Sequence, residues 1–270
     1  MVRIHVIQTG STLVSSAVPN RAAHANPLAY TGLFQSRQKR ISVPVKCFLF
    51  EINDRRILVD AGWSNQCATN AKEHLGFGLW FASEPVLAED EGLAGQLNRL
   101  GVSPADIDAV LMTHLDCDHA SGLADVRGAK SYYVTREELE AGNKGGARYR
   151  PAFWEGVTFT YYSMAENEKA PFSKQCDIFG DGSVIVYFTP THSPGSVAIA
   201  VRDNEKYALF TGDNAYNRHS WEEGCLPGPL YNRENEKRVL AWIADHANNP
   251  DCAAILCAHD PEVPAGEIVL

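Results

Sequence analysis

The sequence lacks any long apolar run. Its longest apolar stretches, such as residues 252–258, are far shorter than the ~20 residues that a membrane-spanning helix needs. Residues 1–7 alternate apolar and polar side chains and lack the apolar run and the small-residue cleavage site of a signal peptide. We therefore expect no membrane partner and a cytoplasmic location.

The sequence also lacks paired cysteines and clusters of basic residues. Its 7 cysteines are scattered without CxxC spacing, which indicates neither a disulfide framework nor a zinc ribbon and fits a reducing cytoplasm. The formal net charge of -9 would repel phosphate backbones, and no group of Lys and Arg offsets it locally. We expect no nucleic acid partner.

What is present is the composition of an ordinary folded domain. Hydrophobic residues make up 45% and charged residues 21% of the 270 residues, which predicts one domain over residues 1–270 with one core. The composition does not decide between a monomer and a homodimer.

Short β-branched or apolar runs alternate with helical patterns along the chain. We predict strands at residues 2–8, 45–52, 55–60, 109–112, 131–134, 157–162, 183–189, 196–202, 206–211 and 253–258. We predict helices at residues 87–100, 135–141 and 234–247. Short turns link many of these strands, which indicates antiparallel sheets packed together with helices outside, rather than one parallel sheet. Residues 10–44 are predicted either as a plain loop or as an excursion over a cleft.

Four potential metal ligands follow the apolar run at residues 109–112. They are His114, Asp116, Asp118 and His119. Unpartnered buried polar groups cost about 1–3 kcal/mol each, so this density of His and Asp indicates metal coordination. In an extended turn the first two point to one side, and where the chain tightens into a helix the last two face an adjacent position. One motif can therefore serve two ions.

Three further candidate ligands also follow predicted strands, where several strand ends could converge. They are His192, Asp213 and His259. Catalytic metals usually take three or four protein groups and leave one position for water. The chain thus offers enough ligands for two divalent ions.

The order and spacing of these motifs resemble the metallo-β-lactamase superfamily, whose motifs run from an early Asp through HxHxDH to a His, an Asp and a last His. The match begins at Leu58-Val59-Asp60-Ala61-Gly62 and ends at His259. The resemblance implies an α/β fold of the α+β type, a four-layer αββα sandwich. It also implies that Asp60 is a buried support for the ligands rather than a ligand.

Within that superfamily the sequence is most similar to the N-acyl homoserine lactonases, because Tyr216 lies three residues after Asp213. Such a tyrosine is used by those lactonases, although an ordinary packed tyrosine is the alternative here. The resemblance implies a hydrolase that opens a lactone or similar ester, an activity that serves quorum quenching. We expect residues 10–44, 63–85 and 142–180 to line the pocket for this small-molecule substrate.

The expected mechanism divides the seven ligands between two ions that Asp213 bridges. One ion takes His114, Asp116 and His192, and the other takes Asp118, His119 and His259. The two ions would make a hydroxide available near neutral pH, and this hydroxide would attack the carbonyl carbon. Tyr216 then stabilises the oxyanion, and Asp118 carries the proton to the leaving alkoxide.

Asp116 departs from the family pattern, since the motif is HxDxDH rather than HxHxDH. A carboxylate is harder than imidazole, so the first site becomes more negative, and manganese or iron become alternatives to zinc. Alternatively, Asp116 is no ligand and leaves one ion weak or absent. Flavodiiron proteins also carry an acidic residue here, so an iron-dependent oxidoreductase is one alternative function. A thioesterase resembling glyoxalase II, with the same metals, is another.

Overall fold

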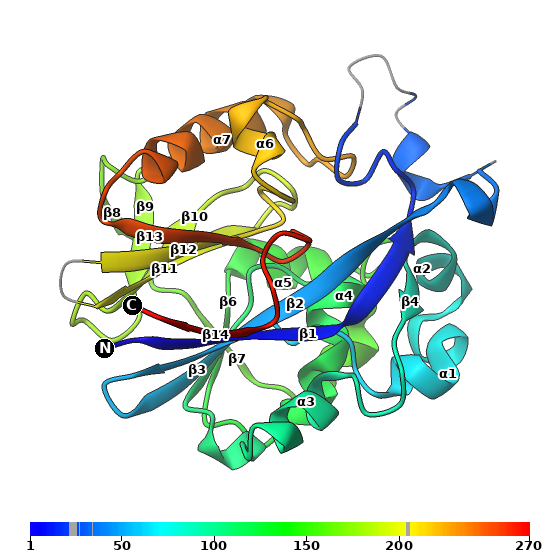
Figure 1. The fold of residues 1–270 in the computed structure, drawn as a ribbon, viewed down its shortest axis with the longest axis horizontal. Helices are drawn as coiled ribbons and strands as arrows, with labels where there is room; N and C mark the ends of the chain where they lie inside the picture. Colours follow the sequence, from blue (N-terminus) through cyan, green and yellow to red (C-terminus); the bar gives the residue numbers. More distant parts are fainter. Residues whose placement is uncertain (22–25, 27, 34, 204–205) are drawn as a thin grey trace.

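The computed structural model describes residues 1–21, 26, 28–33, 35–203 and 206–270. Two β-sheets face each other, with helices on both outer sides (Figure 1). This is the four-layer αββα architecture that the family resemblance implies. Within these ranges no helix combines the length and apolar character needed to cross a membrane.

The first sheet has the strand order β14-β1-β2-β3-β5-β6-β7, and β4 also pairs with β1. Its strands are β1 (Arg3–Val14), β2 (Ile41–Ile52), β3 (Arg55–Val59), β4 (Glu84–Val86), β5 (Ala109–Leu111), β6 (Tyr132–Val134), β7 (Phe159–Tyr161) and β14 (Gly266–Val269). The helices beside it are α1 (Gln66–Leu75), α2 (Phe77–Ala82), α3 (Leu93–Arg99), α4 (Cys117–Ala120) and α5 (Arg136–Asn143).

Part of this sheet is parallel, which corrects the expectation of antiparallel sheets. β3 pairs with β5, β5 with β6, and β6 with β7, all in parallel. A parallel pair needs a long crossover, and each of these connections contains a helix. The short turns that suggested antiparallel pairing belong to other parts of the two sheets.

The second sheet has the strand order β13-β12-β11-β10-β9-β8. Its strands are β8 (Ala165–Glu166), β9 (Lys174–Asp177), β10 (Val184–Phe188), β11 (Val197–Asp203), β12 (Lys206–Gly212) and β13 (Cys252–Cys257). β12 and β13 are parallel, because α6 (His219–Glu222) and α7 (Arg233–Ala247) cross between them on the outer side.

Three apolar layers hold the sandwich together. Alternate residues of a strand face opposite sides of its sheet, so Leu58 of β3 packs toward the outer helices while Ile57 packs between the sheets. In β12, Phe210 packs between the sheets, and its ring lies 4.5 Å from that of Phe50. Leu209 packs under α7. Each sheet therefore buries both faces.

Two predicted elements need correction. β1 and β2 are longer than predicted, so the excursion expected over residues 10–44 is confined to the segment between Val14 and Ile41, of which residues 22–25, 27 and 34 lie outside the described part of the chain. The predicted helix at residues 87–100 begins only at Leu93, because Asp90 adopts a left-handed backbone with φ 60° and Gly92 is extended. Residues 84–86 form β4 instead.

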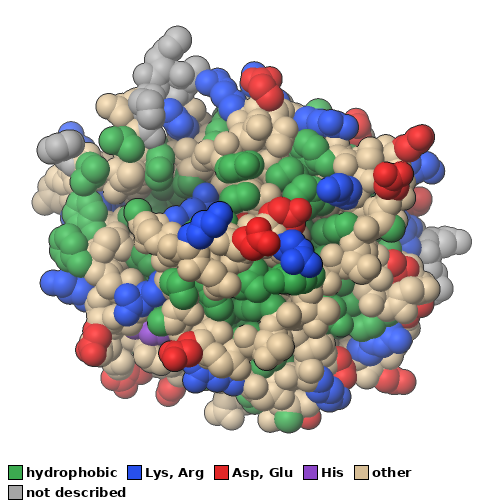
Figure 2. Space-filling view, turned by 180° about the vertical axis from the view of Figure 1, so that it is seen from behind, with side chains coloured by type: hydrophobic (Ala, Val, Ile, Leu, Met, Phe, Trp, Pro, Cys, Tyr) green, Lys and Arg blue, Asp and Glu red, His purple; other side chains and the backbone are tan. Residues whose placement is uncertain are grey.

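Charges of both signs are interspersed on the face shown in Figure 2, where Lys and Arg side chains lie among Asp and Glu side chains. Hydrophobic side chains lie between them in small groups.

Candidate metal centre

The seven candidate ligands lie on loops and a short helix that follow strands of both sheets. His114 and Asp116 follow β5, and Asp118 and His119 lie in α4. His192 lies between β10 and β11, Asp213 follows β12, and His259 follows β13. The two sheets thus contribute different members of one cluster.

The donor atoms form three groups. Within each group, all donor atoms lie within 4.8 Å of one another. The groups are His114, Asp116 and His192; Asp118, His119 and His259; and His114, His119 and Asp213. The first two are the sets expected to hold one ion each. The third connects them through Asp213.

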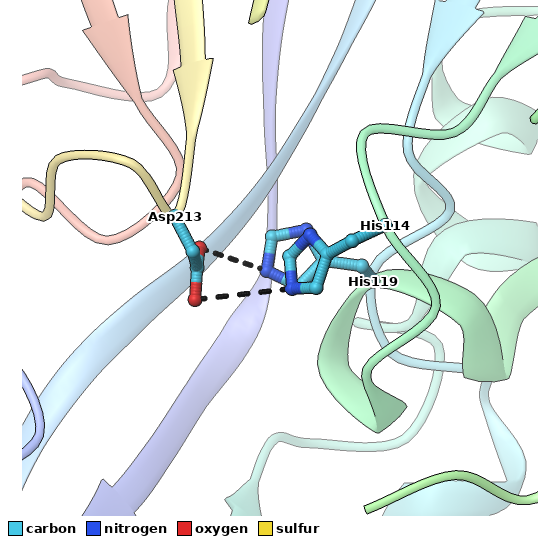
Figure 3. A group of neighbouring side chains, drawn as sticks. All are labelled: His114, His119 and Asp213. Atoms are coloured by element: carbon cyan, nitrogen blue, oxygen red, sulfur yellow. Dashed lines mark ion pairs between the residues drawn. The ribbon is translucent and has the colours of Figure 1, made fainter. Parts of the chain in front are cut away.

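Asp213 turns one carboxylate oxygen toward each set. Its Oδ1 lies 3.1 Å from His119 Nε2 and 3.2 Å from His259 Nε2. Its Oδ2 lies 3.6 Å from His192 Nε2 and 4.0 Å from His114 Nε2. Figure 3 shows this carboxylate facing the rings of His114 and His119, with a different oxygen directed to each ring. A carboxylate in this position could be shared by two ions.

All four histidines present the same ring nitrogen to the centre. The Nδ1 atoms are held from behind: His119 by Asp60 Oδ2 at 2.8 Å, His114 by Thr113 Oγ1 at 3.0 Å, His192 by Pro229 O at 3.0 Å and His259 by Pro44 O at 2.8 Å. Such hydrogen bonds fix the ring orientation of metal-binding histidines. Each Nε2 is left to face the other donors.

Asp60 lies behind the ligands, immediately after β3. Its backbone has φ 58°, and its carboxylate accepts hydrogen bonds from Thr113 N and Thr113 Oγ1, both at 2.8 Å. Its contact with His119 connects it to the second set. The structure therefore places Asp60 where a supporting carboxylate would act.

The chemistry of the cluster fits divalent cations. His114 Nε2 and Asp213 Oδ1 are buried without a hydrogen-bond partner among the residues that the structure describes. Burial alone would raise the pKa of Asp213, but His259 and His119 hold it well below its usual value. Burial would lower the pKa of His119, yet Asp213 and Asp60 raise it well above the usual range. A bound cation would stabilise such a concentration of buried donor atoms.

Tyr216 is buried beside the same cluster. Its hydroxyl donates a hydrogen bond to Asp213 Oδ2 at 2.8 Å, and its ring stacks on that of His259 at 4.9 Å. Burial and the negative charges of Asp213 and Asp118 raise the pKa of Tyr216 well above its ordinary value. The hydroxyl therefore keeps its proton at neutral pH and remains a donor.

Arg148 is a site residue that the sequence analysis missed. Its guanidinium donates to both carboxylate oxygens of Asp116, and its Nη1 donates to His192 O at 2.8 Å. In the sequence it is one arginine in a glycine-containing loop after α5, so no local pattern marks it.

Glu138 was missed for a different reason. It lies three residues after Thr135, whose side chain accepts from Glu138 N, so in sequence it resembles an ordinary helix cap. The structure buries its carboxylate fully, where it accepts from Leu115 N at 3.0 Å, Ser193 Oγ at 2.6 Å and Gly195 N at 3.1 Å. It joins the loop of His114 to the loop of His192.

A cavity of about 520 Å³ opens onto the cluster. Its floor includes Asp116, Asp118, Asp213, Tyr216 and His259. Its apolar wall includes Val14, Val18, Leu33, Val43, Phe77, Leu79 and Phe81. The predicted pocket segments 10–44 and 63–85 thus contribute most of the wall, whereas the segment 142–180 contributes only Ala147 and Arg148. An open groove of about 650 Å³ around Arg3 and Arg56 lies elsewhere and contains none of the candidate ligands.

Fold and site together define the class of the protein. Residues 41–259 match the metallo-beta-lactamase superfamily, and the chain belongs to that superfamily. The resemblance stated from the sequence motifs is therefore confirmed.

Individual relatives point to one branch. The chain is 31% identical over 227 residues to the N-acyl homoserine lactonase AttM of Agrobacterium fabrum, covering 82% of this chain and 83% of that protein. A solved N-acyl homoserine lactone hydrolase with N-hexanoyl-L-homoserine at its catalytic metal center has a TM-score of 0.76 at 20% identity, covering 96% of this chain and 94% of the other. The dizinc quorum-quenching lactonase AidC has a TM-score of 0.63 at 13% identity, covering 98% and 89%. These two likenesses establish the shared fold.

Proposed function

We propose that this protein is a metal-dependent lactonase that opens N-acyl homoserine lactones or similar cyclic esters. One observation carries the proposal: Asp213 lies between two sets of metal donors, with the Tyr216 hydroxyl 2.8 Å from its carboxylate, at the floor of the cavity. The similarity to AttM over 82% of this chain supports the choice of substrate. With such a substrate, the biological role would be quorum quenching.

The centre would hold two divalent ions. His114, Asp116 and His192 would hold one, and Asp118, His119 and His259 the other, with Asp213 shared. We propose zinc first. Manganese and iron are alternatives, because imidazole and carboxylate donors accept all three metals. When bound, the ions would polarise the ester carbonyl and lower the pKa of a water molecule.

The residues of the chain would supply the remaining chemistry. The Tyr216 hydroxyl would donate to the oxygen that becomes negative when the carbonyl carbon is attacked. Asp118, which faces the cavity, would accept the proton released by the attacking water and deliver it to the ring oxygen as the ester bond breaks. The products would be a carboxylate and a free hydroxyl on one open chain.

The apolar wall suits the acyl chain of such a substrate. Val14, Leu33 and Phe77 are among the side chains that line the cavity above the polar floor. Burying apolar surface there would contribute roughly 0.8 kcal/mol for each CH₂ group. The lactone ring would then lie at the metal donors with the chain along the wall.

Metal content and substrate range test the proposal together. Protein purified without added metal should contain near two equivalents of zinc, manganese or iron, measured by mass spectrometry, and should open γ-lactones faster than it hydrolyses thioesters or β-lactams. Preference for thioesters would instead support the glyoxalase II-like alternative. Absence of both metal and hydrolysis would overturn the proposal.

Three further expectations remain proposals. They are a single domain over residues 1–270, a cytoplasmic location, and a monomer or homodimer as the oligomeric state. The location rests on the 7 cysteines, all of them free thiols in the structure.

A further inference from the structure

Asp116 and Arg148 form a paired unit at the position where the motif departs from histidine. The guanidinium approaches the carboxylate with two donors: Nε faces Oδ1, and Nη2 lies 2.9 Å from Oδ2. Two parallel contacts of this kind fix the orientation of the carboxylate as well as its charge. The side chains are only partly exposed, 18% for Asp116 and 30% for Arg148.

The two oxygens of Asp116 have different surroundings. Oδ2 lies 3.0 Å from His192 Nε2 and 3.5 Å from His114 Nε2, so it belongs to the donor group of the first ion. Oδ1 is directed to Arg148 Nε. Oδ2 also accepts from Arg148 Nη2, so Arg148 engages both oxygens while only Oδ2 faces the centre, where the carboxylate can act as a single donor, as an imidazole would.

Arg148 also contacts the chain of a second ligand. Its Nη1 donates to the backbone oxygen of His192 at 2.8 Å. One side chain thus ties two of the three donors of the first set together. A lysine cannot reproduce this, because its ammonium group lacks the planar fork of guanidinium.

The charge of Arg148 offsets the charge that Asp116 introduces. A carboxylate in place of histidine adds one negative charge, which led to the expectation that the first site favours zinc less exclusively. The guanidinium in contact with that carboxylate cancels the added charge. The net charge of the pair is that of a neutral imidazole.

We propose that Arg148 is a positioning residue that makes Asp116 a substitute for histidine in the first metal site. It directs Oδ2 to the ion, occupies Oδ1, and preserves the charge and the zinc preference of a histidine-containing set. This inference rests on the two-ion centre of the proposed function. It stands against the alternative that Asp116 leaves the first site without an ion, and the zinc measurements below decide between the two.

A double-mutant cycle tests the proposal through zinc binding. The variants are Arg148→Met, Asp116→His, the double variant Asp116→His/Arg148→Met, and Arg148→Lys. Arg136→Met, an exposed residue of α5, is the matched control. For each, the zinc equivalents retained after dialysis, the zinc dissociation constant of the weaker site, and zinc uptake from an equimolar zinc and manganese mixture are measured.

We expect Arg148→Met to weaken zinc binding at one of the two sites about 10- to 100-fold, the range typical for groups that support metal ligands. The same variant should take up relatively more manganese, because Asp116 then keeps its full charge. Asp116→His alone should also lose zinc, since an imidazole then faces Arg148. The double variant should again retain near two equivalents of zinc. Arg148→Lys should bind zinc more weakly than the unmodified protein.

Unchanged zinc affinity in Arg148→Met, or a double variant no better than that single variant, would overturn the proposal. Circular dichroism and the thermal midpoint separate these outcomes from misfolding. If the unmodified protein binds two zinc ions without opening lactones, the lactonase proposal fails, and the zinc series still decides the role of Arg148. If it binds fewer than two, both proposals fail.

Discussion

At the scale of single residues, the Tyr216 hydroxyl is the group whose removal most directly tests the mechanism. Tyr216→Phe should lower kcat roughly 100-fold, a loss typical for one donor to a developing oxyanion. Metal content should stay near that of the unmodified protein, because the hydroxyl contacts Asp213 without belonging to a donor group. Steady-state kinetics with a γ-lactone, together with metal analysis, measure both.

Tyr161→Phe is the control, because this tyrosine is exposed in β7. An unchanged kcat in Tyr216→Phe would remove that hydroxyl from the mechanism. It would leave the ordinary packed tyrosine as the role of this residue.

Single residues also show what the sequence could and could not predict. Each candidate ligand directly follows an apolar strand or lies in the motif after one, and this local pattern is visible in the sequence. The role of Arg148 depends on a partner 32 positions away, and that of Glu138 on a contact 55 positions away. No local periodicity encodes such contacts, so the two residues could only be found in the folded chain.

At the scale of elements, α5 connects two loops that carry ligands. The carboxylate of Glu138 accepts three hydrogen bonds from those loops. Glu138→Gln should lower the free energy of unfolding by about 1–3 kcal/mol, because the amide NH₂ group would face donors of Ser193 and Gly195. It should also weaken zinc binding at one of the two sites.

Urea unfolding and zinc titration measure these two effects. Glu137→Gln is the control, because this neighbour is exposed on the same helix. Equal stability of both variants would show that the carboxylate does not hold the loops. The loop that contains Gly195 packs closely against the start of α5, because a Cβ at Gly195 would lie 2.2 Å from Thr135 Oγ1.

The helix α7 contains a buried acid that predicts a pH dependence of stability. Glu236 is fully buried, and neither carboxylate oxygen has a hydrogen-bond partner within the described part of the chain. Burial raises its pKa from 4.5 to about 8. Below pH 4.5 the Glu236 carboxyl group is protonated in both the folded and the unfolded state. Between pH 4.5 and about 8 it is ionised only in the unfolded state, so the free energy of unfolding falls as the pH rises through this range.

Glu236→Gln should therefore increase the free energy of unfolding at pH 8 by a few kcal/mol, on the order of 1.4 kcal/mol for each pKa unit, and by much less at pH 5. Urea unfolding at the two pH values measures this difference. Asp245→Asn, exposed on the same helix, should show no comparable gain. A gain that is equal at both pH values would contradict a buried, protonated Glu236.

The mixed topology of the first sheet shows the limit of prediction for elements. The strands were located in sequence because their apolar runs are local. The relative directions of the strands could not be predicted from the sequence, because the parallel pairing of β3 with β5 and of β5 with β6 depends on how the intervening helices cross the sheet. Such crossings are settled by packing between distant segments.

At the scale of the whole molecule, the candidate metal ligands come from both sheets. Asp213 and His259 come from the second sheet, and His114 and His119 follow a strand of the first. The unfolded chain does not bring these donors together, so bound ions should stabilise the folded state. An ion at about 100 times its dissociation constant contributes about 2.7 kcal/mol.

Metal removal by a chelator should accordingly lower the thermal midpoint by roughly 5–10 °C for a protein of this size, and zinc should restore it. Differential scanning calorimetry measures the shift. In an Asp213→Asn variant the chelator should have a much smaller effect. A midpoint that does not depend on the chelator in the unmodified protein would contradict a centre that joins the sheets.

The pairing of β1 with β14 has a practical consequence for immobilising the protein. Arg3 pairs with Val269, so both chain ends lie at one end of β1, while Val14 at its other end lines the cavity. β1 has 12 residues, and at about 3.3 Å per residue it spans roughly 35–40 Å. A surface anchor or fusion partner attached at either Met1 or Leu270 would therefore be joined at the end of β1 opposite to the cavity.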